Sequence, residues 1–201
     1  MRAAIIGLYN SGSSVLSRIV EDLGADIGRP LWHSHFESKN LAKKLRAWWS
    51  EPELVETVGW EKRVEYLRLW AQYHEASSDL VCAKHPLLCL SAEDLDRAWG
   101  PEFKAIRASR PFETSVRQLE KRDWFEEPEI IQRTLFDACE KYFRNRKHPA
   151  IEIEYDDLLE DPLGTVERIS FFLELELDNW RIRRAASLVE SAPEADKTRE
   201  G

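Results

Sequence analysis

Cysteine and methionine are scarce in this chain of 201 residues, which contains three cysteines and one methionine. The cysteines, Cys82, Cys89 and Cys139, are odd in number and match no zinc-ligand spacing. Cys82 and Cys89 have apolar neighbours in the sequence, which suits reduced, buried thiols. We therefore expect neither a disulfide scaffold nor a cysteine metal site.

Long apolar runs are also missing. An unbroken run such as Ala3–Ile6 falls far short of the roughly 20 residues that cross a bilayer. No charged and then apolar leader precedes a cleavage site. The sequence therefore predicts a soluble protein of the cytoplasm.

An excess of basic residues is absent as well, because 29 Lys and Arg side chains against 37 Asp and Glu give a formal net charge of −8. Such a chain lacks the positive field that draws proteins to nucleic acids or anionic membranes. We expect neither as a partner, and the oligomeric state cannot be read from the sequence. Any anionic ligand must be bound by a local site, and the net charge favours a small, neutral substrate over an anionic polymer.

The order of the predicted elements indicates an α/β fold. Ala3–Ile6 is typical of a strand buried on both faces of a parallel sheet, and helical periodicity follows it. Three further strands are predicted at Leu80–Ala83, Phe103–Ala108 and Ile151–Tyr155. Helices are predicted at 15–23, 41–49, 60–73 and 128–146, and another begins at Asp161-Pro162. A proline and then a helix-like stretch follow each of the second and third predicted strands. Strands that alternate with helices predict a mainly parallel sheet with helices on its faces.

The length predicts one domain, which we place at residues 1–191, followed by a frayed, charge-rich tail at 192–201. A helical insertion at 37–78 separates the first two strands. Because loops after the first strand border the ligand crevice of an open α/β sheet, we expect this insertion to cap the substrate side. Its periodicity predicts four core contacts, at Trp48, Leu67, Trp70 and Tyr73.

The segment from Gly7 to Ser14 has the spacing of a phosphate-binding loop, G-x-x-x-x-G-K-[ST], with Ser13 in place of the lysine. Backbone N–H groups and the following helix N-terminus can bind a phosphate without that lysine, and the serine hydroxyls add donors. A serine N-cap that binds no ligand is the alternative. An ATPase or GTPase is disfavoured, because the lysine is missing and no apolar run ends in an aspartate that could bind Mg²⁺.

Three segments together resemble sulfotransferases that use 3′-phosphoadenosine 5′-phosphosulfate (PAPS). Tyr9–Leu16, Y-N-S-G-S-S-V-L, resembles the 5′-phosphosulfate loop of that family, P-K-S-G-T-T-W-L. Ala105–Ser115 looks like its 3′-phosphate segment, a strand that ends in arginine and proline before a helix with a serine. Glu154–Pro162 is similar to the element Y-E-D-L-x-x-D-P, and Phe171–Leu175 to the F-L-G-L ending.

The resemblance implies a three-layer, P-loop NTPase-like α/β fold. It implies transfer of a sulfuryl group from PAPS to a hydroxyl or amine of a small-molecule acceptor, with no metal ion. PAPS carries anionic groups at both ends, but it needs no metal bridge between β- and γ-phosphates. The residues implied in cofactor binding are Asn10, Ser11, Gly12, Ser13, Ser14, Arg107, Arg110 and Ser115.

Asn10 stands where the family has a loop lysine, and its amide brings a donor but no charge. Lys84, at the end of the second predicted strand, can supply the cation if the strand ends meet at the ligand crevice. A solvated lysine at a strand end is the alternative. Two other functions stay open: a Mg²⁺-dependent nucleoside or small-molecule kinase, and a nucleotide-binding protein without activity.

Two arginines compete for the 3′-phosphate. Arg107 stands eight residues before Ser115, whereas the arginine-proline pair favours Arg110. We favour Arg110 with Ser115, because Arg110 follows the strand directly and a guanidinium can bind a phosphate through two donors. An arginine solvated at the start of a helix is the alternative, and it would be poorly placed against the helix dipole.

Sulfuryl transfer to a hydroxyl needs a general base close to the acceptor. His85, beside Lys84, is the leading candidate for catalysis, because histidine titrates near working pH. His33, His35 and Glu37 lie where the family often places acceptor-binding residues. For any single histidine, a position on the surface or in the core is more common than a catalytic role. His33 and His35 also have the spacing of two metal ligands, but no third ligand follows, so no metal is expected.

Overall fold

A computed structural model describes residues 1–50, 54–100 and 102–190 of the chain. The predicted tail at 192–201 lies outside the described residues. Within the described ranges, every helix is too short or too polar to cross a membrane. The predicted location in the cytoplasm stays a prediction.

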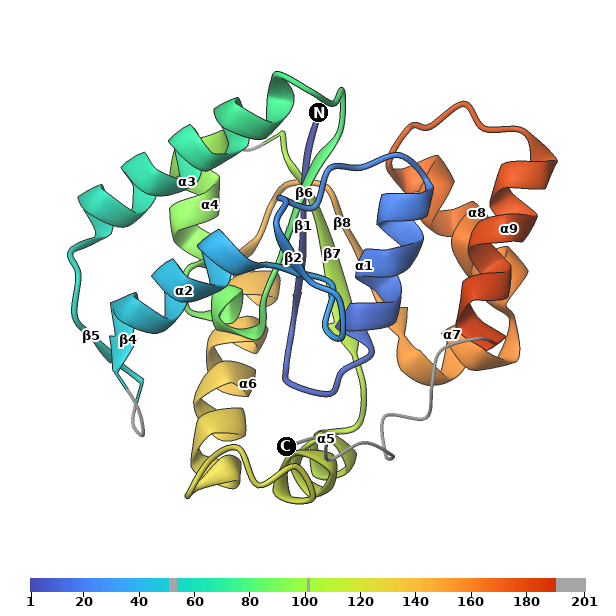
Figure 1. The fold of residues 1–201 in the computed structure, drawn as a ribbon. Helices are drawn as coiled ribbons and strands as arrows, with labels where there is room; N and C mark the ends of the chain where they lie inside the picture. The colour runs from blue at the N-terminus through green and yellow to red at the C-terminus, as the bar shows by residue number, and fades with distance from the viewer. Residues whose placement is uncertain (51–53, 101, 191–201) are drawn as a thin grey trace.

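The central sheet has four strands in the order β6-β1-β7-β8, and all three neighbouring pairs are parallel (Figure 1). The chain passes from β1 to β6 on one side and then to β7 on the other. The strand order therefore reverses at the carboxyl end of β1, where open α/β sheets bind ligands. The predicted parallel α/β sheet is confirmed. The strands are β1 (Arg2–Gly7), β6 (Val81–Lys84), β7 (Lys104–Ser109) and β8 (Ala150–Glu154).

Helices cover both faces of the sheet and give it three layers (Figure 1). Successive side chains of β1 point to opposite faces, so Ala3 and Ile5 belong to one core, and Ala4 and Ile6 to the other. One face is covered by α1 (Ser13–Asp22), α7 (Tyr155–Glu160), α8 (Pro162–Phe172) and α9 (Asn179–Glu190). The other carries α2 (Lys39–Trp48), α3 (Trp60–Glu75), the 3₁₀ helix η1 (Pro86–Cys89), α4 (Ala92–Trp99) and α6 (Pro128–Asn145), with α5 (Phe112–Glu120) beside α6.

Two short hairpins that the periodicity does not predict lie between α1 and α3. The first pairs β2 (Leu31–Trp32) with β3 (Glu37–Ser38), and the second pairs β4 (Trp49–Ser50) with β5 (Val55–Glu56). The Ser38 hydroxyl caps α2, where it accepts from the Leu41 N–H at 3.4 Å. Helices α7 and α9 are likewise absent from the sequence-based prediction.

Three of the four core contacts predicted in the insertion are confirmed, since Trp48, Leu67 and Trp70 are buried. The prediction for Tyr73 is wrong, because 77% of this residue is exposed. The buried stripe of α3 includes Leu67 and His74. Tyr73 lies roughly 100° around the helix from His74 and points to solvent.

We expect Leu67→Ala to lower the free energy of unfolding by about 2–5 kcal/mol, because it empties space in a packed core. Tyr73→Ala on the same helix should change it by less than about 1 kcal/mol. Chemical denaturation of the two variants measures both values. Equal losses would contradict the assignment of the two faces of α3.

Candidate functional site

The predicted phosphate loop connects β1 to α1. Its backbone turns through left-handed conformations at Asn10, with φ of 60°, and at Gly12, with φ of 85°. The Ser11 hydroxyl donates to the Leu8 carbonyl at 2.8 Å and closes the turn. Because α1 begins at Ser13, the N–H groups of Ser13 and Ser14 have no acceptor within the helix, whereas those of Val15 and Leu16 donate to the Gly12 carbonyl at 3.0 and 3.2 Å. This arrangement of backbone donors is suited to an anion.

Segments that are distant in the sequence meet at this loop. Arg110, one residue beyond β7, donates to the Asn10 carbonyl at 3.3 Å. Its guanidinium lies 4.6 Å from the centroid of the Tyr155 ring, at the start of α7. A Cβ on Gly12 would lie 2.3 Å from Cδ2 of Tyr155, so only glycine fits beneath this ring. The three motif segments therefore form one structural site.

Arg107 and Arg110 have different surroundings. Arg107 forms ion pairs with Glu140 and Glu152, which occupy its guanidinium. Among the residues that the structure describes, no carboxylate pairs with Arg110. Ser115 lies in the first turn of α5 and is fully buried. The geometry thus favours Arg110 over Arg107 as the arginine available to a ligand.

Two buried polar atoms of the first two motif segments have no hydrogen-bond partner within the described part of the chain. They are Nδ2 of Asn10 and Oγ of Ser115. Native proteins rarely leave buried polar atoms unpaired, because each costs about 1–3 kcal/mol. Both atoms can donate a hydrogen bond. They therefore fit an anionic ligand at this loop.

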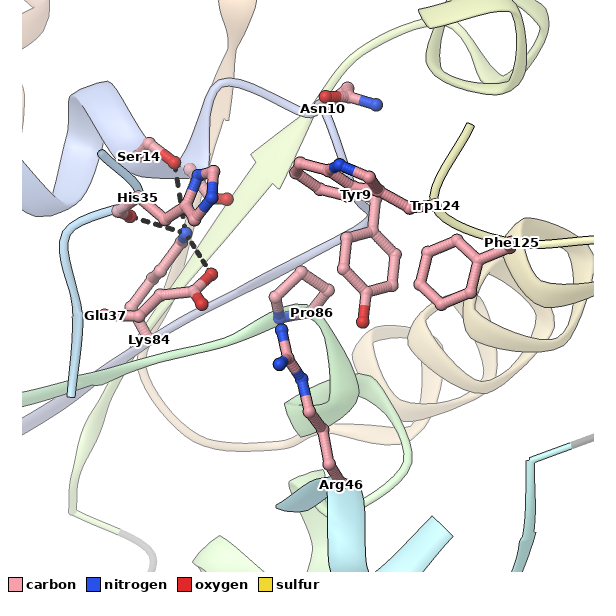
Figure 2. A pocket seen from close by; sticks show the side chains of 11 residues that line it. Tyr9, Asn10, Ser14, His35, Glu37, Arg46, Lys84, Pro86, Trp124 and Phe125 are labelled. Carbon is pink, nitrogen blue, oxygen red and sulfur yellow. Dashed lines mark hydrogen bonds and ion pairs between the residues drawn. The ribbon is translucent and has the colours of Figure 1, made fainter. Parts of the chain in front are cut away.

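A cavity of ≈ 430 Å³ opens beside the loop (Figure 2). It brings together six of the predicted site residues from the β1–α1 loop, α1, β6 and the β2–β3 hairpin: Asn10, Ser13, Ser14, His35, Glu37 and Lys84. Its other lining residues are Tyr9, Arg46, Pro86, Trp124 and Phe125.

Lys84 is buried at the floor of this cavity, with 3% of its side chain exposed. Its Nζ donates to Oε1 of Glu37 at 2.7 Å, to the His35 carbonyl at 3.0 Å and to the Ser14 hydroxyl at 3.1 Å (Figure 2). All three ammonium donors are therefore used, and the solvated alternative does not describe this lysine. Its charge lies one hydrogen bond from the phosphate loop.

Glu37 links this lysine to the adjacent histidine. Burial raises the pKa of the Glu37 carboxyl, but the Lys84 ammonium and its hydrogen bond bring the net pKa below the usual value. Glu37 is therefore ionised at neutral pH. Its Oε2 lies 3.8 Å from Nε2 of His85, so the carboxylate stands between the two side chains.

The three predicted histidines differ in their access to the cavity. His85 is 1% exposed and does not line the cavity. Its Nδ1 accepts from the Leu87 N–H at 3.1 Å, and burial lowers its pKa to about 4. His33 is exposed in the β2–β3 turn, outside the lining. His35 lines the cavity, and burial lowers its pKa, so its imidazole is neutral at neutral pH. The geometry favours His35 over His85 as the group that faces a ligand.

Four of the lining residues are not among the predicted site residues: Tyr9, Arg46, Trp124 and Phe125. Trp124 and Phe125 lie in the charge-rich stretch between α5 and α6, where two adjacent aromatic residues are the only local signal. Arg46 is an exposed residue of an amphipathic helix, a position that carries no functional signal in sequence. Only the tertiary fold brings these side chains to the loop.

The cysteines and the side chains that could bind a metal ion have the following surroundings in the structure. Cys82, Cys89 and Cys139 are free and buried. In residues 1–50, 54–100 and 102–190, no three His, Cys, Asp or Glu side chains are grouped as metal ligands would be.

Comparison with known proteins shows the fold but gives no close relative. No protein-family model and no curated protein matches the sequence. Among solved structures, sulfotransferase STF9 from Mycobacterium avium matches with a TM-score of 0.65 and 13% identity, over 96% of this chain and 68% of that one. The sulfotransferase domain of the Synechococcus PCC 7002 olefin synthase matches with a TM-score of 0.60 and 16% identity, over 92% and 77%.

Mouse sulfotransferase SULT7A1, solved in complex with 3′-phosphoadenosine 5′-phosphate (PAP), matches with a TM-score of 0.52 and 13% identity. That match covers 95% of this chain and 64% of the mouse protein. The chain therefore has the sulfotransferase fold. The fold expected from the three motifs is confirmed, whereas identities this low leave activity and substrate to the residues of the site.

Proposed function

We propose that this protein transfers a sulfuryl group from PAPS to a hydroxyl or amine of a small acceptor. The observation that carries this proposal is the position of Lys84, buried and 3.1 Å from Ser14 of the loop. A strand residue thereby supplies the cation that the loop lacks at Asn10. The fold, shared with a sulfotransferase that was solved with PAP, supports the same assignment.

The two ends of PAPS have separate partners in this proposal. The backbone donors at 12–14 and the Asn10 amide hold the 5′-phosphosulfate, and Arg110 with Ser115 holds the 3′-phosphate. The unpaired atoms of Asn10 and Ser115 support this arrangement, because both are buried donors without acceptors. The ion pairs of Arg107 with Glu140 and Glu152 give that arginine a structural role.

Bound PAPS supplies the sulfuryl group, which leaves PAP when the acceptor oxygen bonds to sulfur and the sulfur–oxygen bond to the 5′-phosphate breaks. Lys84 stabilises the charge that develops on the departing phosphate. His35 takes the proton of the acceptor hydroxyl, since its imidazole is neutral and lines the cavity. Glu37 holds Lys84 in position.

The cofactor assignment predicts that PAP stabilises the protein without metal, by about 2.7 kcal/mol at a concentration of 100 Kd. Arg110→Met should weaken PAP binding at least about tenfold, because a charged phosphate contact is lost. Arg107→Met should keep PAP affinity but lower stability, since Glu140 and Glu152 lose their cation. Thermal-shift titration and calorimetry measure these effects.

The same titration separates the other functions. Stabilisation by ATP with Mg²⁺ but not by PAP would assign a kinase. Binding of PAP without turnover of any alcohol, phenol, amine or sugar would assign an inactive nucleotide-binding protein. No response to any nucleotide would overturn the proposal.

Removal of the Lys84 charge should lower kcat by about 10²–10³, the usual effect of losing one preorganised donor to the departing oxyanion. Lys84→Met alone leaves the Glu37 carboxylate buried without its cation, which also destabilises the fold. The double variant Lys84→Met/Glu37→Gln removes both charges and should fold and bind PAP, yet stay inactive. Turnover at the wild-type rate in the double variant would refute the role of Lys84.

His35→Asn should lower kcat by about 10²–10⁴, the range for loss of a general base. Because burial lowers the pKa of His35 from its usual 6.5, kcat of the wild type should fall on the acid side with a midpoint below pH 6.5. The variant should lack this limb, and the matched variant His33→Asn should keep it. If kcat instead falls with a midpoint close to pH 4, and only His85→Asn removes this fall, His85 would be the general base.

A further inference from the structure

Arg46 gives the cavity a cation that the reaction itself does not use. It extends from α2 toward Pro86, whereas Ser14 lies at the other side of the cavity (Figure 2). Its guanidinium lies 4.7 Å from the centroid of the Trp32 ring. Among the described residues, no carboxylate lies within ion-pair distance of it. Arg46 is therefore available to a ligand.

The charges that line the cavity do not cancel. Glu37 balances Lys84 through their 2.7 Å ion pair, and Arg46 is left over. The pKa of His35 reflects the same field: burial lowers it most, and the cations of Lys84, Arg122 and Arg46 lower it further against the opposing effect of Glu37. The cavity is therefore locally positive in a protein of net charge −8.

Aromatic side chains line the cavity between Lys84 and Arg46. The ring centroids of Tyr9 and Phe125 lie 5.2 Å apart, and those of His35 and Trp124 lie 5.3 Å apart. Trp124 is 46% exposed, which leaves apolar surface open to a ligand. Since ≈ 430 Å³ must also hold the sulfuryl end, the acceptor has to be small.

We propose, on the basis of the proposed function, that the acceptor is a small hydroxylated aromatic carboxylate. Its hydroxyl lies at the His35 and Lys84 end, its ring lies against Trp124 and Tyr9, and its carboxylate pairs with Arg46. A guanidinium can bind a carboxylate through two parallel hydrogen bonds, which fixes the orientation of the acceptor as well as its charge. This assignment replaces the neutral acceptor expected from net charge.

Three acceptors of nearly equal size test the charge preference: 3-(4-hydroxyphenyl)propanoate, its primary amide and 4-(2-aminoethyl)phenol. The wild type should show a kcat/KM or an affinity at least about tenfold higher for the carboxylate than for the amide, and the lowest value for the amine. Arg46→Gln should bring the carboxylate and the amide to within about threefold. Arg46→Glu should invert the order and favour the amine.

Lys43→Gln is the matched control, because it removes a positive charge from the exposed face of the same helix outside the cavity lining. It should keep the wild-type preference for the carboxylate. An equal loss of preference in Lys43→Gln would show a general field effect and overturn the role of Arg46. Equal use of the three acceptors by the wild type would overturn the proposal as well.

Calorimetry with each acceptor, with and without PAP, separates this inference from the function on which it rests. Failure to bind PAP contradicts the sulfotransferase function, yet a carboxylate preference that depends on Arg46 would still support the ligand class. Binding of PAP together with absence of any charge preference contradicts the ligand class alone.

Discussion

The buried ion pair of Lys84 and Glu37 determines how the whole site is arranged. Each charge would cost several kcal/mol to bury alone, so the two side chains must stay paired and fully hydrogen-bonded. Lys84 ends β6, Glu37 begins β3, and the same ammonium also binds Ser14 of α1 and the His35 carbonyl. The pair thereby fixes the β2–β3 hairpin against the phosphate loop and directs the His35 ring into the cavity.

In the proposed function, the cation that stabilises the departing phosphate comes from Lys84 of strand β6 and not from the loop. Lys84 is the last residue of β6, where it pairs with Ile5 of β1, and three hydrogen bonds hold its ammonium, so the side chain has little freedom to reorient. Its field is in place before any ligand arrives, which is the condition for effective electrostatic stabilisation. The partner carboxylate reduces that field, but it also keeps the ammonium charged and aimed at Ser14. In the proposed function, the loop then needs only donors, which the Asn10 amide and the backbone N–H groups at 12–14 provide.

The sheet, the loop and the position of Lys84 beside the loop were predictable, because their signals are local or follow from strand polarity. A buried strand at Ala3–Ile6 predicts a parallel sheet, and parallel strands place Lys84 beside the loop. Which of the two histidines, His85 or His35, lines the cavity was not predictable from the sequence. His85 turns back to cap the 3₁₀ helix at Leu87, so its ring leaves the cavity. Arg46 and Trp124 depend on helix and loop packing, which no short pattern records.

The net charge of the chain and the charge of its cavity act over different distances. Screening at physiological ionic strength limits the field of surface carboxylates to about 8 Å, so the distant acidic residues contribute little inside the cavity. There, the balance of Lys84, Glu37 and Arg46 decides which ligand charge is favoured. A polyanion that extends beyond the cavity would still meet the acidic surface. If the acceptor is the proposed carboxylate, the net charge of the chain disfavours a long anionic ligand, and the cavity favours a ligand with a single negative group.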